Sequence, residues 1–223
     1  FTGSVATGRR IATAALTNLK KVTLELGGKS PMVVFPDFDL DIAVDYALFA
    51  IYCNAGQVCS AGSRMIVEQS IYDQFIKKMA ARAKKIRVGP GLESETEMGP
   101  LVSETQMKRV LEYVEIGKKE GAKLVTGGDQ PKGEKYGNGY YVNPTIFSDV
   151  KSDMRIVQEE IFGPVVVVQK FSSEEEAVEL ANDSLFGLAG AVFTNDITRA
   201  HRVVKQLRVG ITWVNAFHNS YAE

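Results

Sequence analysis

The sequence of 223 residues contains only two cysteines, two histidines and one tryptophan. Two cysteines imply no disulfide framework, so the expected location is a reducing compartment, the cytoplasm. With two histidines and no His–Cys spacing, the sequence predicts neither a metal site nor a Cys–His catalytic pair.

Long apolar runs and long runs of one charge are also missing. No stretch approaches the ~20 apolar residues that span a bilayer, and no signal-peptide pattern occurs. The formal net charge is −1, and basic residues never run for more than a few positions. We therefore expect no membrane and no nucleic-acid partner. The remaining composition, 45% hydrophobic and 24% charged, is typical of a globular protein.

Helical and strand-like periodicities alternate along almost the whole chain. The pattern predicts helices over 5–17, 39–52, 71–85, 104–120, 173–182 and 196–206. It predicts strands over 22–26, 32–35, 64–68, 123–126, 165–170, 189–194 and 210–214, and a surface loop over 127–138. Such alternation favours an α/β fold, a three-layer α/β/α arrangement with a largely parallel twisted sheet.

Two short segments carry the candidate chemistry. Cys59 lies in segment 54–63 (Asn-Ala-Gly-Gln-Val-Cys-Ser-Ala-Gly-Ser), where small neighbours leave its sulfur open to a substrate carbon. Glu25 lies in segment 24–31 (Leu-Glu-Leu-Gly-Gly-Lys-Ser-Pro), where we expect it to be partly buried and to face a cavity. A thiolate nucleophile with a carboxylate base suits covalent chemistry at a carbonyl carbon. The plain alternatives are an inert buried thiol and a structural ion pair.

These two segments resemble, in order and spacing, the active-site signatures of the NAD(P)-dependent aldehyde dehydrogenase superfamily. Three further motifs fit the same family: Phe-Thr-Gly-Ser at 1–4, Glu-Glu-Ile-Phe-Gly-Pro at 159–164 and Trp-Val-Asn at 213–215. Segments 57–63 and 216–219 are most similar to the betaine-aldehyde and related bacterial branches. The resemblance implies oxidation of a small aldehyde to a carboxylic acid with NAD or NADP, NAD being favoured. It also implies a homodimer or homotetramer for the full-length protein.

The resemblance assigns a role to each matching residue. Cys59 would form a thiohemiacetal and then a thioester, and Glu25 would activate the water that releases the acid. The residues expected around the cofactor are Gly3, Ser4 and Gly8 at the phosphates, Leu26, Gly27, Glu160 and Phe162 at the nicotinamide end, and Gln106 and Arg109 near the adenosine ribose. Those expected at the aldehyde pocket are Ser60, Phe217, His218 and Tyr221. Asn215 would support the loops behind Cys59, and Cys53 would pack on the apolar face of helix 39–52.

The resemblance also suggests how the chain is divided. Residues 1–26 would be the last part of a dinucleotide-binding domain, 27–215 the catalytic domain, and 216–223 the start of a return segment. We expect a piece of a longer enzyme that is inactive alone, because the family's oxyanion-binding asparagine and the main dinucleotide strands would lie upstream. Two rival hypotheses stay open: a cofactor-independent thiol esterase or acyl-transfer enzyme, and a folded fragment without catalytic function.

Overall fold

A single seven-stranded sheet organises the part of the chain that the computed structural model describes, residues 1–218. Its order is β3-β4-β5-β2-β1-β6-β7, and every neighbouring pair is parallel except the antiparallel pair β3–β4. The strands are β1 (Pro31–Val34), β2 (Arg64–Glu68), β3 (Lys123–Thr126), β4 (Thr145–Ser148), β5 (Val165–Phe171), β6 (Ala189–Phe193) and β7 (Ile211–Val214).

The helices connect these strands and begin at capping side chains. They are α1 (Val5–Leu16), α2 (Leu40–Tyr52), α3 (Tyr72–Ala83), α4 (Glu104–Lys119), α5 (Arg155–Gln158), α6 (Glu174–Asn182) and α7 (Ile197–Val204), with 3₁₀ turns η1 (Cys53–Gly56) and η2 (Glu134–Tyr136). Side-chain oxygens of Ser4, Asp39, Ser103, Ser173 and Asp196 accept hydrogen bonds from peptide N–H groups in the first turns. These caps satisfy donors that a helix start leaves free, which explains where five of the helices begin.

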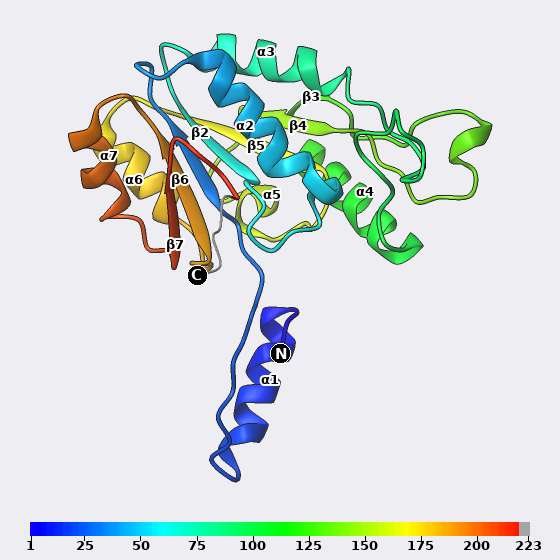
Figure 1. Cartoon of the computed structure of the whole chain (residues 1–223), viewed down its shortest axis with the longest axis horizontal. Coiled ribbons are helices and arrows are strands. Elements are labelled where there is room, and N and C mark those ends of the chain that lie inside the picture. Colours follow the sequence, from blue (N-terminus) through cyan, green and yellow to red (C-terminus); the bar gives the residue numbers. More distant parts are fainter. Residues whose placement is uncertain (219–223) are drawn as a thin grey trace.

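Two apolar cores lie on opposite faces of the sheet. Met32 and Val34 belong to the core that includes α2, α3 and α4, whereas Val33 belongs to the core with α6 and α7. Alternate residues of a strand point to opposite faces, so a continuous apolar strand such as β1 fills both cores. The result is a layered α/β/α body, with α2 and α3 over one side of the sheet and α6 and α7 by the other (Figure 1). The predicted fold class is confirmed.

The structure departs from the predicted elements at residues 22–26, at β4 and at α5. Residues 22–26 are not a strand of the sheet. Among residues 1–218 their backbone partners are Phe1 and Gly3, which give a single bridge between Thr2 and Glu25. Strand β4 and helix α5 were not predicted. Each has only four residues.

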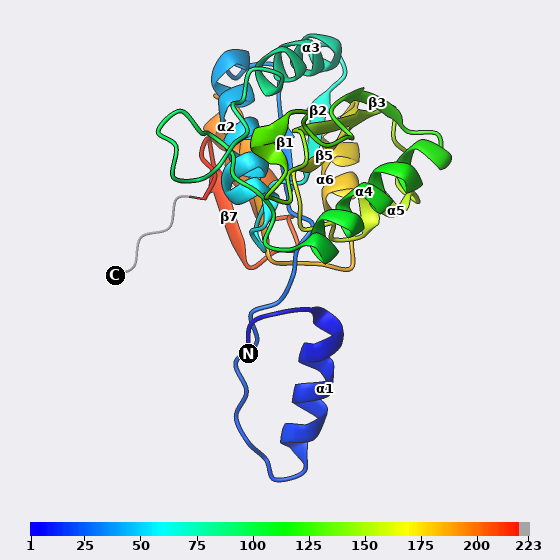
Figure 2. The same cartoon turned by 90° about the vertical axis from the view of Figure 1, so that its right-hand side faces the viewer.

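Helix α1 and its return segment stand apart from the layered body (Figure 2). This arm, residues 1–26, exposes large apolar side chains, with Leu16 70% and Leu19 86% exposed. Within residues 1–218, no helix combines the length and the apolar character needed to cross a membrane.

Candidate active site

One cleft of about 340 Å³ brings the chemical motifs together. It is lined by Thr2, Gly3, Ser4, Glu25, Leu26, Gly27, Cys59, Gln106, Arg109, Glu160 and Phe162. Every residue that the sequence analysis placed in catalysis or at the cofactor lies on this cleft, with the exception of Gly8. The segments that meet here are up to 160 residues apart in the chain, from Thr2 to Phe162.

Cys59 lies in a turn between η1 and β2 and is half-buried. The turn before it has an unusual backbone, because Asn54, Ala55 and Gly56 all adopt left-handed conformations with φ of 51°, 53° and 73°. Such conformations are costly for a residue with a side chain, and they are found where a local geometry is functionally required. At Gly56 a Cβ would lie 2.1 Å from the carbonyl oxygen of Gly163, so this loop is in backbone contact with the segment after Glu160.

The sequence analysis expected Cys53 on the apolar face of helix α2, and this expectation was wrong. Cys53 follows the last residue of the helix and begins η1, and it is half-buried. Helix α2 ends at Tyr52, the last residue of the predicted helix, and the left-handed residues Asn54 and Ala55 prevent it from continuing.

Glu25 faces the cleft from the segment that links the arm to β1. Its peptide N–H donates to the carbonyl oxygen of Phe1, and its carbonyl oxygen accepts from Gly3. The side chain is exposed, although the apolar neighbours suggested partial burial. In residues 1–218 nothing covers this side of the cleft closely enough to bury a carboxylate.

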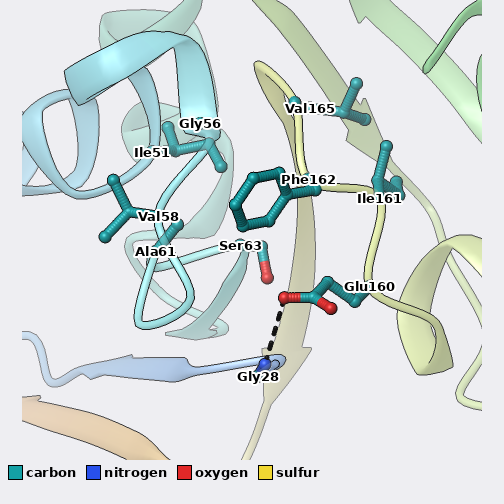
Figure 3. Close-up of a pocket in the computed structure, with 11 residues that line it drawn as sticks. Gly28, Ile51, Gly56, Val58, Ala61, Ser63, Glu160, Ile161, Phe162 and Val165 are labelled. Carbon is teal, nitrogen blue, oxygen red and sulfur yellow. Dashed lines mark hydrogen bonds between the residues drawn. The ribbon is translucent and has the colours of Figure 1, made fainter. Parts of the chain in front are cut away.

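Glu160 is the half-buried carboxylate of the cleft. Its Oε1 accepts a hydrogen bond of 3.2 Å from the N–H of Gly28, as Figure 3 shows. A Cβ on Gly27 would lie 2.1 Å from the carboxylate, so the absence of a side chain there makes room for Glu160. Burial raises the pKa of Glu160, against the opposing effects of the Gly28 N–H and of positive Lys29 and Arg109. The carboxylate is ready to accept further hydrogen bonds from hydroxyl donors in the cleft.

Gln106 and Arg109 hold the Glu160 segment from α4. The Gln106 amide donates to the carbonyl oxygens of Ile161 (3.0 Å) and Phe162 (2.8 Å), and Arg109 donates to that of Glu160 (2.9 Å). Both side chains line the cleft, but these donors are engaged with protein backbone. A contact with an adenosine ribose, expected from the resemblance, would have to use the donors of Arg109 that remain.

The predicted phosphate turn is only partly as expected. Ser4 caps α1 with a 3.3 Å hydrogen bond from the N–H of Thr7, and Gly3 donates its N–H to Glu25. Gly8 lies inside α1, where its N–H is bonded to the carbonyl oxygen of Ser4. A Cβ on Gly8 would lie 2.7 Å from Leu26, so this glycine serves helix packing rather than anion binding.

The residues that the resemblance places at the aldehyde pocket differ in their burial. Phe217 is fully buried against Trp213 and Gly62, so its ring is closed off from a substrate in this structure. His218 is half-buried, with Nε2 3.3 Å from the carbonyl oxygen of Ser60, the residue after Cys59. Burial lowers the pKa of His218, which the contact with Ser60 partly opposes. Tyr221 lies outside the described residues.

Asn215 and His201 are not among the residues that line the cleft. Asn215 joins β7 to the end of β6, because its amide exchanges hydrogen bonds of 3.0 Å in both directions with the backbone of Thr194. His201 is exposed on α7. Among residues 1–218 no group of three or more histidine, cysteine, aspartate or glutamate side chains is arranged to hold a metal ion.

The sequence analysis missed the contributions of Gly28 and Tyr113. Gly28 stands next to the predicted Gly27, but only its peptide N–H acts, and no side-chain pattern signals that. Tyr113 contacts Glu159, and a signal for it did exist: Gln106, Arg109 and Tyr113 follow each other at intervals of three and four residues on α4, which places them on one helix face.

The fold and the cleft define a member of one family. The family model described as "Aldehyde dehydrogenase family" matches residues 1–223, and the chain belongs to this family. It is 55% identical over 223 residues to the betaine aldehyde dehydrogenase of Bacillus subtilis, covering 100% of this chain and 46% of that protein. It is 51% identical over 218 residues to the betaine aldehyde dehydrogenase of Rhizobium johnstonii, covering 98% of this chain and 45% of that protein.

A solved structure gives the same picture. The betaine aldehyde dehydrogenase of Staphylococcus aureus in complex with NAD+ is 46% identical and superimposes with a TM-score of 0.98, over 100% of this chain and 45% of that chain. The chain therefore spans about half the length of the relatives it matches.

Proposed function

We propose that this chain is the catalytic part of an NAD-dependent aldehyde dehydrogenase that converts an aldehyde to a carboxylic acid. The observation that carries the proposal is the cleft in which Cys59, Glu25 and Glu160 meet. Relatives at 46–55% identity that are named betaine aldehyde dehydrogenases support the same reaction class. A cytoplasmic location and a homo-oligomeric full-length enzyme belong to the proposal as well.

The proposal includes a division of the chain into parts. In our proposal residues 1–26, the arm with α1, belong to a dinucleotide-binding domain, 27–215 form the catalytic domain, and 216–223 begin the return toward the first. The distance of the arm from the layered body (Figure 2) and its exposed Leu16 and Leu19 favour this division. Exposed apolar side chains on a helix indicate a surface that packs against further protein.

The residues of the cleft fit a nicotinamide dinucleotide. The Glu160 carboxylate would accept hydrogen bonds from the nicotinamide ribose hydroxyls, beside a backbone that Gly27 keeps free of side chains. Phe162 would pack near the ring, and the N-terminus of α1, which begins after Ser4, offers a favourable end for a phosphate. When bound, NAD accepts the hydride that leaves the aldehyde carbon.

The residues of this chain would perform the remaining steps. The Cys59 thiolate forms a C–S bond with the aldehyde carbon, and the electron pair of the carbonyl moves to oxygen. In residues 1–218 the N–H of Cys59 has no acceptor, which leaves it free to stabilise that oxyanion. Loss of the hydride gives a thioester. Glu25 then takes a proton from water, the water oxygen bonds to the acyl carbon, the C–S bond breaks, and the acid and the thiolate are released.

The substrate class is inferred from the relatives and from the rings near Cys59. The rings of His218 and Phe49 lie 5.9 Å apart between centroids, and Nε2 of His218 is 3.3 Å from the carbonyl oxygen of Ser60. Aromatic faces attract a quaternary ammonium group. We therefore propose an aldehyde that carries such a group, as the name of the relatives suggests.

A spectrophotometric assay of the full-length protein tests the function. We expect NADH formation with betaine aldehyde, and a lower kcat/KM for 3,3-dimethylbutanal, which has the same shape without the charge. Ester cleavage without NADH formation under all conditions would instead favour the cofactor-independent esterase. Equal kcat/KM for the two aldehydes would leave the dehydrogenase in place and contradict the substrate class.

The 223-residue chain provides a second test. We expect it to be a poor or inactive dehydrogenase, because removing even one oxyanion donor typically costs ~10²–10³ in rate. Thiol reactivity and residual esterase activity at Cys59 need no cofactor and should survive. Calorimetric titration of this chain with NAD measures the point directly, and micromolar binding with full aldehyde turnover would refute the division of the chain that we propose.

A further inference from the structure

The segment that carries Glu160 is bonded residue by residue to one face of helix α4. The side chain of Tyr113 bonds to residue 159, that of Arg109 to residue 160, and that of Gln106 to residues 161 and 162. The three side chains are spaced by three and four positions, so they lie along one face of the helix. Residues 159–162, which have no regular secondary structure, are thereby held in place by helix α4. Sites built on helices and strands are more precisely positioned than sites on loops.

Tyr113 differs from Arg109 and Gln106 because it bonds to a carboxylate side chain and not to backbone oxygens. The hydroxyl of Tyr113 donates to Oε2 of Glu159 at 2.5 Å, and Arg155 donates to both oxygens at 2.8 and 2.9 Å. The bonds from Arg155 and then from Tyr113 lower the pKa of Glu159 to about 2, so it is ionised at every working pH. Charge-assisted bonds from a bidentate guanidinium and a phenol are strong and directional.

Glu159 and Glu160 are adjacent but face different partners. The Glu159 side chain is bonded to α4 and α5, while the Glu160 side chain is bonded to the N–H of Gly28 across the cleft. Arg109 joins the two sites, because it donates to the Glu160 carbonyl oxygen and lies 5.1 Å from the centre of the Tyr113 ring. The side chains of Glu159 and Glu160 thus extend from one short stretch of backbone that Arg109 also contacts.

We infer that Tyr113 and Arg155 are positioning residues that, through Glu159, set where the Glu160 carboxylate stands in the cleft. This inference rests on the proposed function, in which Glu160 contacts the cofactor. Tyr113 is the better residue of the pair to test, because it is only 5% exposed. Arg155 is half-exposed, and an exposed ion pair contributes less.

The test is Tyr113→Phe in the full-length enzyme, which removes the hydroxyl and keeps the packing of the ring. We expect KM for NAD to rise about tenfold, which corresponds to about 1.4 kcal/mol, and hydride transfer in a single turnover to slow. Ester hydrolysis at Cys59 without NAD should stay within twofold of the unmodified enzyme, because it does not use Glu160. Glu115→Gln is the matched control, since Glu115 lies on the same helix in an exposed ion pair with Lys118.

A second variant guards against a folding defect. Arg155→Lys keeps a positive charge near Glu159 but loses the bidentate geometry, and we expect a smaller rise in KM for NAD, about threefold. Unchanged KM and hydride transfer in both variants would overturn the inference. So would a parallel loss of esterase activity, which would mark Tyr113 as a general structural residue. If the unmodified full-length protein forms no NADH with any aldehyde, the proposed function itself fails, and this outcome is seen before any variant is compared.

Discussion

The peptide N–H of Gly28 lies 3.2 Å from Oε1 of Glu160, a residue 132 positions later in the chain. On its other side, Gly28 is so close to the cysteine loop that a Cβ would be 2.5 Å from the carbonyl oxygen of Cys59. One glycine thus sets the separation between the loop of the proposed nucleophile and the proposed cofactor carboxylate. Any residue larger than glycine at this position would place its Cβ against the carbonyl oxygen of Cys59, so the position requires glycine.

Replacement of Gly28 by alanine should therefore damage the whole site. The new methyl group meets a backbone oxygen, which cannot rotate away, so the Cys59 loop must move. We expect Gly28→Ala to lower the melting temperature and to reduce both the esterase and the dehydrogenase activity at least tenfold. Differential scanning calorimetry and the two activity assays measure these effects, and wild-type values in all three would contradict the close approach.

Gly27→Ala is the matched comparison with a different expected outcome. The atoms nearest to its Cβ would be those of the Glu160 carboxylate, the first at 2.1 Å, and that flexible side chain can rotate away. The melting temperature and esterase activity should stay near those of the unmodified protein, while KM for NAD rises several-fold. If esterase activity fell as far as in Gly28→Ala, the separation of the two contacts would be wrong.

The two cysteines should differ sharply under mutation. Cys59 lines the cleft, whereas Cys53 begins η1 and is not among the lining residues. In the full-length protein we expect Cys59→Ala to abolish dehydrogenase activity and Cys53→Ala to retain most of it. Loss of a covalent nucleophile removes the entire route, so a residual kcat above about a tenth of the wild-type value for Cys59→Ala would exclude covalent catalysis.

The sequence predicted the fold well because its layers repeat a strong pattern. The run 165–168 consists of four valines, and a strand covered on both faces needs such a composition. The strand predicted at 22–26 was wrong because a short apolar run does not specify its partner. Those residues pair with 1–3, outside the sheet.

The sequence predicted the residues of the site whose side chains carry the chemistry. It did not predict which side chains the packing of the fold buries or pairs with the backbone. Cys59, Glu25 and Glu160 stand in recognisable motifs, and the fold brings them to one cleft. The burial of Phe217 depends on Gly62, and that contact leaves no local trace in the sequence. The engagement of Gln106 with backbone oxygens could not be foreseen either, because an amide serves a ligand and a carbonyl group equally well.

Glu25 should act after the hydride has left. Its exposed carboxylate on the cleft is accessible to water, which is the partner that deacylation requires. We expect Glu25→Gln to leave the first turnover of NADH formation nearly unchanged and to slow the steady state at least tenfold. Stopped-flow absorbance should then show a burst followed by a slow phase, and an unchanged steady-state rate would remove Glu25 from the mechanism.

Lys29 should make the stability of the chain depend on pH in a particular direction. Its side chain is 2% exposed, and its Nζ has no hydrogen-bond partner in residues 1–218. Burial first, and then the positive Arg64, lower the pKa of Lys29 to about 7, although Glu160 and Glu159 act in the opposite direction. In the unfolded chain the amine keeps its ordinary value of 10.5. Between these two values the unfolded state binds more protons, so the free energy of unfolding rises with pH.

The penalty of the buried charge is consequently complete below pH 7 and disappears as the pH approaches 10.5. We expect Lys29→Met, which keeps the length of the side chain and removes the charge, to raise the melting temperature of the 223-residue chain at pH 6. The gain should shrink steadily between pH 7 and pH 10. Lys84→Met, at an exposed position after α3, is the control and should show no such trend. Thermal unfolding at a series of pH values decides the matter, and a difference between Lys29→Met and the unmodified chain that stays constant with pH would mean that this amine finds a partner in solution.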